Sequence, residues 1–443
     1  MRGRVLRIAA CLLAIALCMR HAWAESGPTI LRDAEIENDL RTMAAPIFRA
    51  AGLVPKDVAI YLVQDSQINS FVVGGQAIFI NTGLILRAKT PNQLIGVIAH
   101  ETGHIAGGHV VRTKEALHNA QVESIIAMAV ALGASVAGRS SAPMLGAAGV
   151  GERSFLRFSV AQEATADHAA LTYLDRSGQS ARGLLKFFEI MQTEEMLSGD
   201  RQEPWVRTHP FSQQRAEYVR RHVESSRYSD APDPPGSAEL LDMVQLKIRA
   251  FLDPPGTTLA NYPESDRSLK ARYARAIANY RIPKLDIALP LVDGLIRDYP
   301  DNPYFRELKG QMLFENGRIR EAMQPYEQAV KMAPNEPLLR ISLSQAYIES
   351  GEASLNKRAI AYLNDASRAE GKESQVWHFL AVAYGRDNQF GMAALSLAEE
   401  ALALGKKKDA LQQSNRAKQL LPKNGAGWMR ADDINHEAQH LDD

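Results

Sequence analysis

The feature that most constrains the fold is a repeat in the C-terminal half of the chain. Pro300 recurs as Pro334 and Gly317 recurs as Gly351, a period of 34 residues that begins near Asp266. A unit of this length holds two short helices, and one such hairpin cannot bury its apolar face alone. We therefore expect this region to stack its hairpins into an all-α, curved solenoid with a concave surface.

The spacing of small and aromatic residues in this region resembles the tetratricopeptide repeat. In the unit 303–336, the small, small, aromatic, small and proline positions of that repeat are filled by Gly310, Ala322, Tyr326, Ala329 and Pro334. The unit that follows needs about three extra residues before Ala359. We expect about four repeats over residues 266–422 and a C-terminal tail over 423–443, with the last boundary left open.

Proline and glycine mark the border of the repeat region. The stretches "SDAPDPPGSAE" (229–239) and "DPPGTTLANYPES" (253–265) are dense in turn-forming residues and flank one short helical stretch. We expect a linker with a short helix over residues 229–265 and a separate domain over residues 25–228.

The N-terminus has the composition of a secretory signal peptide. Arginines precede a short apolar run (8–19), and the small residues of 22–24 precede a cut ahead of Glu25. A retained anchor is a weaker alternative because the run is short for a membrane span. A lipoprotein cut at Cys18 is weaker too, since a bulky leucine precedes that cysteine. We expect residues 1–24 to be removed and the chain to be exported to the periplasm, with association with the outer membrane left open.

Cleavage changes the charge and the cysteine content. The full chain has a formal net charge of 0, and residues 1–24 hold four arginines and no acids, so the mature chain carries −4. Both cysteines leave with the signal, which excludes a disulfide and suits an oxidising compartment. Mild acidity, without a basic stripe of interleaved aromatics, argues against nucleic acid as a partner.

Upstream of the linker, the hydrophobic pattern indicates both helices and strands. Asp33–Ala51 is amphipathic and predicts a helix. Val58–Asp65 and Phe71–Ile80 are rich in β-branched and aromatic residues and predict strands, with a bulge or turn at Gly74-Gly75.

A capping box predicts the start of a second helix at Thr90. Pro91 follows at the first helical position, and Gln93 stands three residues after the cap. The apolar pattern continues through "NQLIGVIAHETGHIAGGH", so we expect a half-buried helix that reaches His109.

This helix contains an H-E-x-x-H pattern. His100 and His104 are four residues apart, so their imidazoles lie on one face and suit the ligand positions of one zinc ion. Glu101 points to the same cleft and can accept a proton from a water whose pKa the zinc lowers to about 7. Helix geometry places His109 on the far side, so we expect it to contact the core or a ligand rather than the metal. Three glycines soften the end of the helix and leave the orientation of His109 open.

A second capping box, at Ser159 and the glutamine three residues later, predicts a helix that ends at Gly178. Glu163 and Asp167 share one face of it. One carboxylate is expected to reach the zinc ion, while the other accepts the N–H of a ligand histidine, His100 by preference. Two solvated acids on an exposed helix are the alternative if this helix stands alone.

The hydrophobic pattern of residues 114–153 does not indicate a single structure. The Ala-rich apolar run Ile125–Gly138 is about fourteen residues long, whereas a membrane span needs about 20. A buried helix is one interpretation, and a mobile flap or membrane-surface helix over the site is the other.

Taken together, these motifs resemble the zincin peptidases of the CAAX-protease and Oma type. The stretches that carry the resemblance are "INSFVVGGQAIFINTGLI", "AHETGH", "FSVAQEATAD" and "THPFSQQRAEYV", followed by the repeats. The resemblance covers nearly all of the mature chain. It implies an α+β zincin-like (gluzincin) metalloprotease domain with a zinc cofactor, followed by the tetratricopeptide-repeat solenoid.

The resemblance also implies roles for single residues. His100, His104 and Glu163 would be zinc ligands, and Glu101 would be the general base. His209 would be a further metal contact in the position of the water, or a group near the developing oxyanion. An edge strand above the zinc helix would bind an extended peptide by main-chain pairing. Its residues would be Gln76, Ala77, Ile78, Phe79 and Ile80.

Two functions fit these features. The first is a zinc endopeptidase whose repeats deliver unfolded or misassembled outer-membrane proteins or dock on the barrel assembly machinery, with peripheral membrane contact as a further candidate. The second is a chaperone or adaptor in which the repeats bind partners and His209 or the flap plugs the metal site. Glycosidase chemistry by Glu163 and Asp167 is disfavoured, because carboxylates on one helix face do not flank a sugar ring. We favour the endopeptidase, since all the catalytic residue types are present.

Overall fold

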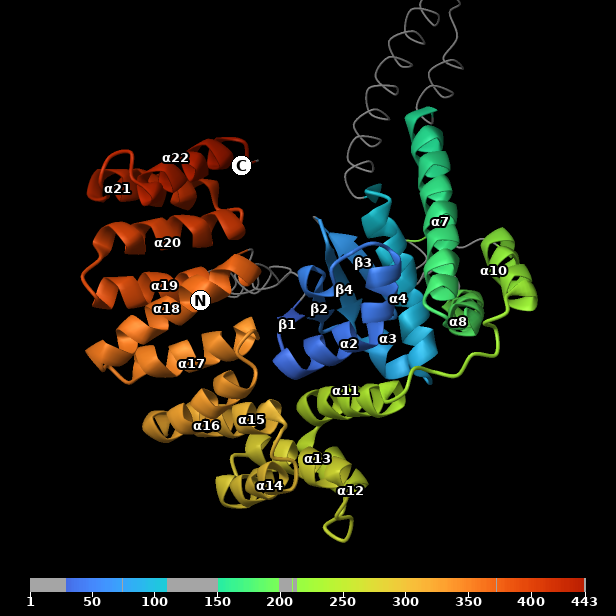
Figure 1. Cartoon of the computed structure of the whole chain (residues 1–443), viewed down its shortest axis with the longest axis horizontal. Helices are drawn as coiled ribbons and strands as arrows, with labels where there is room; N and C mark the ends of the chain where they lie inside the picture. The colour runs from blue at the N-terminus through green and yellow to red at the C-terminus, as the bar shows by residue number, and fades with distance from the viewer. Residues whose placement is uncertain are drawn as a thin grey trace, which may run out of the picture. The chain divides into compact units, whose positions relative to one another are not determined.

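The computed structural model describes residues 29–73, 75–109, 150–198, 209, 213–371 and 373–441. The chain divides into two compact units (Figure 1). Unit 1 is Glu37–Asp242 with the residues before Asp33, and unit 2 is Asp33–Ile36 with Met243–Asp443. Over the described ranges, every helix is too short or too polar to cross a bilayer. The predicted signal peptide and nearly all of the segment 114–153 lie outside these ranges.

Unit 1 contains a four-stranded sheet with the order β1-β2-β4-β3. Its strands are β1 (Ile30–Leu31), β2 (Ala59–Val63), β3 (Ser70–Val73) and β4 (Ala77–Asn81). β4 pairs parallel with β2 and antiparallel with β3. The hairpin between β3 and β4 turns where the sequence predicts it, and its Gly75 has a φ of 102°, which favours glycine.

The prediction that Gln76–Ile80 forms an edge strand is wrong. β4 has a partner on each side, so its main-chain groups already bond within the sheet. After the hairpin the chain returns between β2 and β3, which leaves β3 at the edge of the described sheet. The N–H of Asn81 donates to the carbonyl of Asn69 (3.0 Å). In an antiparallel ladder, hydrogen-bonded residue pairs alternate with pairs that are not hydrogen-bonded. Because Asn69 and Asn81 are a hydrogen-bonded pair, the N–H and C=O groups of Ser70 and Val72 point away from β4.

Helices surround the sheet of unit 1. In the described ranges they are α2 (Ala34–Ala50, of which Ala34–Ile36 belongs to unit 2), the 3-10 turn η1 (Pro55–Asp57), α3 (Thr82–Arg87), α4 (Pro91–Ala106), α7 (Val150–Arg176), α8 (Arg182–Ser198) and α10 (Gln213–Ser225). α4 packs against β3, α7 and α8 (Figure 1). The Thr90 hydroxyl accepts the N–H of Gln93 (3.4 Å), which confirms the predicted cap.

The predicted start of the second helix at Ser159 is wrong. α7 already runs from Val150, so Ser159 lies in its interior. A serine caps a helix only where its own backbone leaves the helical region, and here the preceding residues continue the helix. The predicted end is confirmed: Gly178 has a φ of 71°, in the left-handed region, just after the last turn.

Unit 2 consists of paired helices. α11 (Ser237–Leu252) and α12 (Pro255–Asn261) occupy the region predicted as a linker. The pairs that follow are α13 (Leu269–Arg281) with α14 (Leu285–Asp298), α15 (Pro303–Glu315) with α16 (Ile319–Met332), α17 (Pro337–Glu349) with α18 (Ala353–Glu370), α19 (Ser374–Arg386) with α20 (Phe390–Ala403), and α21 (Lys407–Leu420) with α22 (Ala426–Gln439). The extra residues expected after 337 lengthen α18 to 18 residues, against 14 in α16.

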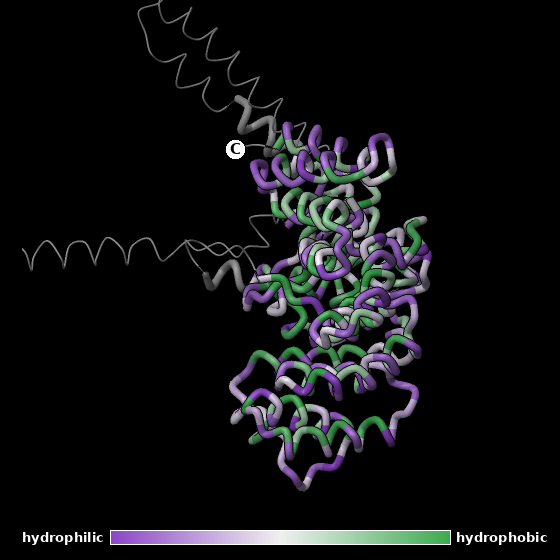
Figure 2. Tube along the Cα trace, turned by 90° about the vertical axis from the view of Figure 1, so that its left-hand side faces the viewer, coloured by the Kyte–Doolittle hydropathy of each residue, from purple (hydrophilic) through white to green (hydrophobic). Residues whose placement is uncertain are grey.

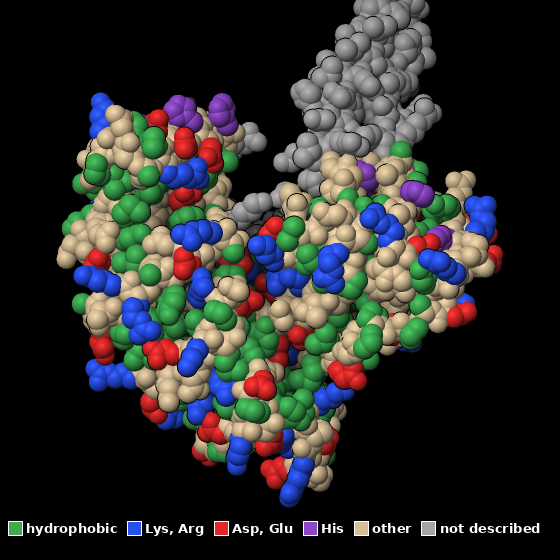
Figure 3. Space-filling view, viewed as in Figure 1, with side chains coloured by type: hydrophobic (Ala, Val, Ile, Leu, Met, Phe, Trp, Pro, Cys, Tyr) green, Lys and Arg blue, Asp and Glu red, His purple; other side chains and the backbone are tan. Residues whose placement is uncertain are grey.

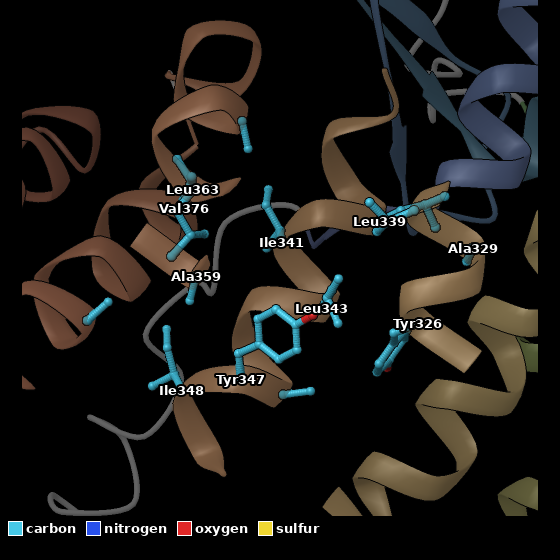
Figure 4. Close-up of a cluster of buried hydrophobic side chains, with 14 of the residues drawn as sticks. Tyr326, Ala329, Leu339, Ile341, Leu343, Tyr347, Ile348, Ala359, Leu363 and Val376 are labelled. Carbon is cyan, nitrogen blue, oxygen red and sulfur yellow. The ribbon is translucent and has the colours of Figure 1, made fainter. Parts of the chain in front are cut away.

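Neighbouring hairpins share a hydrophobic core. Tyr326 of α16, Tyr347 of α17, Leu363 of α18 and Val376 of α19 come from successive helices and lie in one cluster (Figure 4). A Cβ at Gly310 would lie 2.6 Å from the Tyr326 ring, which explains why this repeat position is small. Hydrophobic and hydrophilic residues alternate along the helices (Figure 2), as one buried face requires. Positive and negative side chains are intermixed over the face shown in Figure 3.

Candidate metal centre

Four buried side chains of unit 1 converge on one point. α4 supplies His100 and His104, α7 supplies Glu163, and His209 joins them. One potential ligand atom from each residue lies within 4.8 Å of the others. The Nε2 atoms of His100 and His104 are 3.1 Å apart, and each is 3.3 Å from a Glu163 oxygen. The ligands predicted from two distant segments are therefore brought together.

Gly103 allows the two ligand-bearing helices to approach each other. A Cβ at this position would lie 2.8 Å from the carbonyl oxygen of Ala166 in α7, closer than such atoms can pack. Ala166 stands between Glu163 and Asp167, so this contact brings both acids up to the histidines of α4.

Each ligand histidine contacts another side chain through its second ring nitrogen. His100 Nδ1 lies 2.9 Å from Asp167 Oδ1, the contact that the sequence predicts for this acid. His104 Nδ1 lies 3.0 Å from His109 Nδ1. The expectation that His109 contacts a ligand rather than joining the cluster is confirmed, although the far-side position is wrong, because α4 ends at Ala106 and a left-handed Gly108 (φ 61°) turns the chain back.

Arg215 contacts both acids of α7, and the sequence did not predict this role. From α10 it places Nε 2.6 Å from Asp167 Oδ2 and Nη1 3.0 Å from Glu163 Oε2. Its only signal in the sequence is its place in "THPFSQQRAEYV", six residues after His209. Burial disfavours both carboxylates, but Arg215 and His100 hold the pKa of Asp167 below its usual value.

Glu101 is fully buried and uses only one of its carboxylate oxygens within the described residues. Oε1 accepts the hydroxyl of Ser70 (2.6 Å), another contact that the sequence analysis missed. Among the described residues, Oε2 has no hydrogen-bond partner. His209 Nε2 lies 3.6 Å from Glu101 Oε1 and 3.2 Å from the Ser70 carbonyl. The base candidate therefore presents one oxygen beside the four-residue cluster.

The charge balance of the cluster fits a divalent cation. Among the described residues, three buried carboxylates (Glu101, Glu163 and Asp167) meet one guanidinium, that of Arg215. With neutral imidazoles, these three carboxylates and one guanidinium have a net charge of −2, which one divalent cation would balance. Although burial opposes protonation, the hydrogen bonds to Asp167 and Glu163 raise the pKa of His100 to about 9, which shows that the cluster attracts positive charge.

The other pKa shifts and the donor set agree with this charge balance. Burial lowers the pKa of His104. Burial opposes the charge of Glu163, but His209 and the two α4 histidines hold its pKa well below the usual range. Three imidazole nitrogens and one carboxylate oxygen are ligands typical of zinc and related divalent ions.

A second H-E-x-x-H pattern, His436–His440, lies near the C-terminus. Its surroundings in the structure differ from those of the first pattern. His436 and His440 are exposed at the end of α22, and Glu437 pairs with Arg430 (2.7 Å). Among the described residues, groups of three or more potential metal ligands form only at the cluster of unit 1.

Comparisons with known proteins match this division of the chain. The sequence model of peptidase family M48 matches residues 31–223, and two tetratricopeptide-repeat models match 273–337 and 313–383. A beta-barrel assembly-enhancing protease of Yersinia pestis is 23% identical over 83% of this chain and 77% of its own length. The protease of the same name in Escherichia coli K12 is 21% identical over 80% of this chain and 73% of its own length.

A shorter relative matches less than half of the chain. The metalloprotease LoiP of Escherichia coli K12 is 30% identical over 42% of this chain, a match that covers 71% of the relative. The converging histidines and glutamate lie inside the matched peptidase region, and helices α14 to α18 lie inside the matched repeat region. The chain therefore belongs to peptidase family M48 and is a metalloendopeptidase with tetratricopeptide repeats in its second unit.

Proposed function

We propose that this protein is a zinc-dependent endopeptidase of the periplasm that degrades or chaperones misassembled outer-membrane barrel proteins. The observation that carries the catalytic part is the buried carboxylate of Glu101, whose Oε1 lies 3.6 Å from His209 Nε2 of the cluster and whose Oε2 has no hydrogen-bond partner among the described residues. The barrel proteins and their assembly machinery enter the proposal through the two relatives named beta-barrel assembly-enhancing protease. The repeats of unit 2 supply the surface for these partners.

In this proposal, His100, His104 and Glu163 hold the zinc ion. When bound, zinc supplies Lewis acidity toward the scissile carbonyl and toward the attacking water. Asp167 accepts the N–H of His100 and keeps that ring in the tautomer that leaves Nε2 for the metal. Arg215 balances the charge of both acids of α7.

The chain's own residues then bind the peptide and move the proton. The substrate pairs with the outer edge of β3 at Val72, whose main-chain groups face outward, because the Ser70 carbonyl already lies 3.2 Å from His209 Nε2. Glu101 takes a proton from the attacking water on Oε2 and passes it to the leaving amine. His209 serves as a fourth ligand, or it stabilises the developing oxyanion.

The test is Glu101→Gln in the full chain. The amide keeps the shape of the side chain but cannot take up a proton. We expect cleavage of a quenched fluorescent casein to fall at least about 100-fold. Zinc content, measured by mass spectrometry, should not change. Because His436 and His440 could bind stray zinc, the Glu101→Gln variant and the reference protein that keeps Glu101 both carry His436→Ala and His440→Ala. Retained proteolysis would contradict the role of Glu101.

A chaperone or adaptor remains the second candidate, because His209 Nδ1 lies 3.1 Å from Glu163 and 3.3 Å from His100 Nε2, where it can occupy the reacting position. The same substitution separates the two functions. If cells with Glu101→Gln assemble outer-membrane proteins as the wild type does, the repeats are the working part. If assembly fails although the variant is folded and loaded with zinc, proteolysis is needed.

A further inference from the structure

We propose that Ser70 is a positioning residue for the peptidase reaction, because its hydroxyl holds one oxygen of Glu101 so that the other faces the reacting water. This inference rests on the proposed role of Glu101 as general base. It assigns a function to a side chain of the edge strand, whose main chain alone enters the proposed substrate binding.

The contact has the features of a charge-assisted hydrogen bond. Ser70 Oγ and Glu101 Oε1 are 2.6 Å apart, and both residues are 0% exposed, so water does not compete for either atom. An ionised carboxylate only accepts, so the serine hydroxyl is the donor. The bond distinguishes the two carboxylate oxygens, since Oε1 is occupied and Oε2 has no partner in the described structure.

The sheet fixes the position of the hydroxyl. Ser70 is opposite Ile80 in the β3–β4 hairpin, and the adjacent Asn69 accepts the N–H of Asn81 (3.0 Å). β3 packs directly against α4, the helix that carries Glu101. The Ser70 hydroxyl is therefore held by paired backbone rather than by a free loop, as a group that orients a base requires.

Without this hydroxyl, Glu101 has another partner within reach. His209 Nε2 lies 3.6 Å from the same oxygen, Oε1. Without the hydroxyl, the buried Oε1 loses its donor, and a carboxylate that turns toward His209 no longer holds Oε2 in its present orientation. Loss of the hydroxyl should therefore slow the chemical step and leave peptide binding, which uses the backbone of β3, unchanged.

The experiment compares Ser70→Thr with Ser70→Val. The two side chains have nearly the same shape, so any packing cost is shared, and only threonine keeps the donor. Steady-state cleavage of a quenched fluorescent peptide, melting temperature and zinc content are measured for each full-length variant. We expect kcat of Ser70→Val to be about 10- to 100-fold below that of Ser70→Thr, with the same KM and zinc content.

Two further variants make the result decisive. Ser70→Ala removes the hydroxyl without adding bulk and should lose kcat as Ser70→Val does. Thr102→Val removes a buried hydroxyl of α4 that, within the described part of the chain, bonds only the Ile98 carbonyl (2.7 Å), and it should leave kcat unchanged. Equal kcat in Ser70→Thr and Ser70→Val, or wild-type kcat in Ser70→Ala, overturns the inference. If Glu101→Gln remains active, the proposed base is wrong; if only the Ser70 variants remain active, the positioning role alone fails.

Discussion

At the residue scale, the two ligand histidines of α4 are oriented by chemically different partners. His100 faces the carboxylate of Asp167, whereas His104 faces the imidazole of His109 (3.0 Å between the Nδ1 atoms). When Nε2 of His104 binds a metal, Nδ1 carries the proton and donates it to His109. His109 is therefore part of the support of the metal site, although it is not among the residues of the cluster.

This contact predicts that His109→Ala weakens metal binding. The substitution leaves the Nδ1–H of His104 without its acceptor, and removal of such a contact lowers metal affinity about 10- to 100-fold. The measurement is competition for zinc with a fluorescent chelator, in the background of His436→Ala and His440→Ala. His168→Ala is the control, because His168 lies exposed on α7 and bonds Tyr218 (2.7 Å) rather than a ligand. Equal affinity in both variants would show that His109 is only a core residue.

At the element scale, the site depends on how closely α4 approaches α7. Neither helix carries a complete ligand set, and their contact at Gly103 and Ala166 brings Glu163 to the two histidines. Gly103 therefore allows the two helices to pack closely, and the cost is a less stable helix.

Gly103→Ala should separate these effects. Helix propensity alone predicts a gain of about 1 kcal/mol. The added methyl would lie 2.8 Å from the Ala166 carbonyl, so we expect instead a loss of about 1–3 kcal/mol in the free energy of unfolding, together with weaker zinc binding. Urea denaturation and chelator competition measure the two quantities. Gly385→Ala in α19 is the matched control, since nothing lies within 4 Å of its added Cβ and propensity alone acts there. A stabilised Gly103→Ala would contradict the close-packing explanation.

At the scale of the whole molecule, all the residues of the metal cluster belong to unit 1, while unit 2 is built from hairpins with cores of their own. A ligand that binds only the native state stabilises only the unit that holds it.

Removal of the metal should therefore lower the melting temperature of one unit. We expect calorimetry of the full chain with His436→Ala and His440→Ala to show two transitions, of which a chelator shifts only one. For zinc at 100 times its dissociation constant, the shift corresponds to about 2.7 kcal/mol. Glu163→Ala should abolish the response to the chelator. An equal shift of both transitions would mean that the units unfold together.

Much of the architecture follows from local signals in the sequence. The period from Pro300 to Pro334 predicts the paired helices of unit 2, and the cap at Thr90 predicts the start of α4, because propensity and capping act within a few residues. The edge-strand error arises because a distant neighbour decides: β4 is enclosed on both sides, by β2 and β3. The S-x-x-Q pattern at Ser159 fails for a local reason, since the residues before it already continue α7.

The sequence by itself determined which segments are helices, strands and repeats, and which side chains are able to bind a metal. The H-E-x-x-H pattern alone does not distinguish His100–His104 from His436–His440, because it places two imidazoles on one helix face in either case. The accompanying motifs assigned the site to the first pair, and only the tertiary structure shows why the second pair lacks a further ligand among the described residues. A helix contact at Gly103 brings a carboxylate from a distant segment to the first pair and buries it, whereas the second pair is left in water.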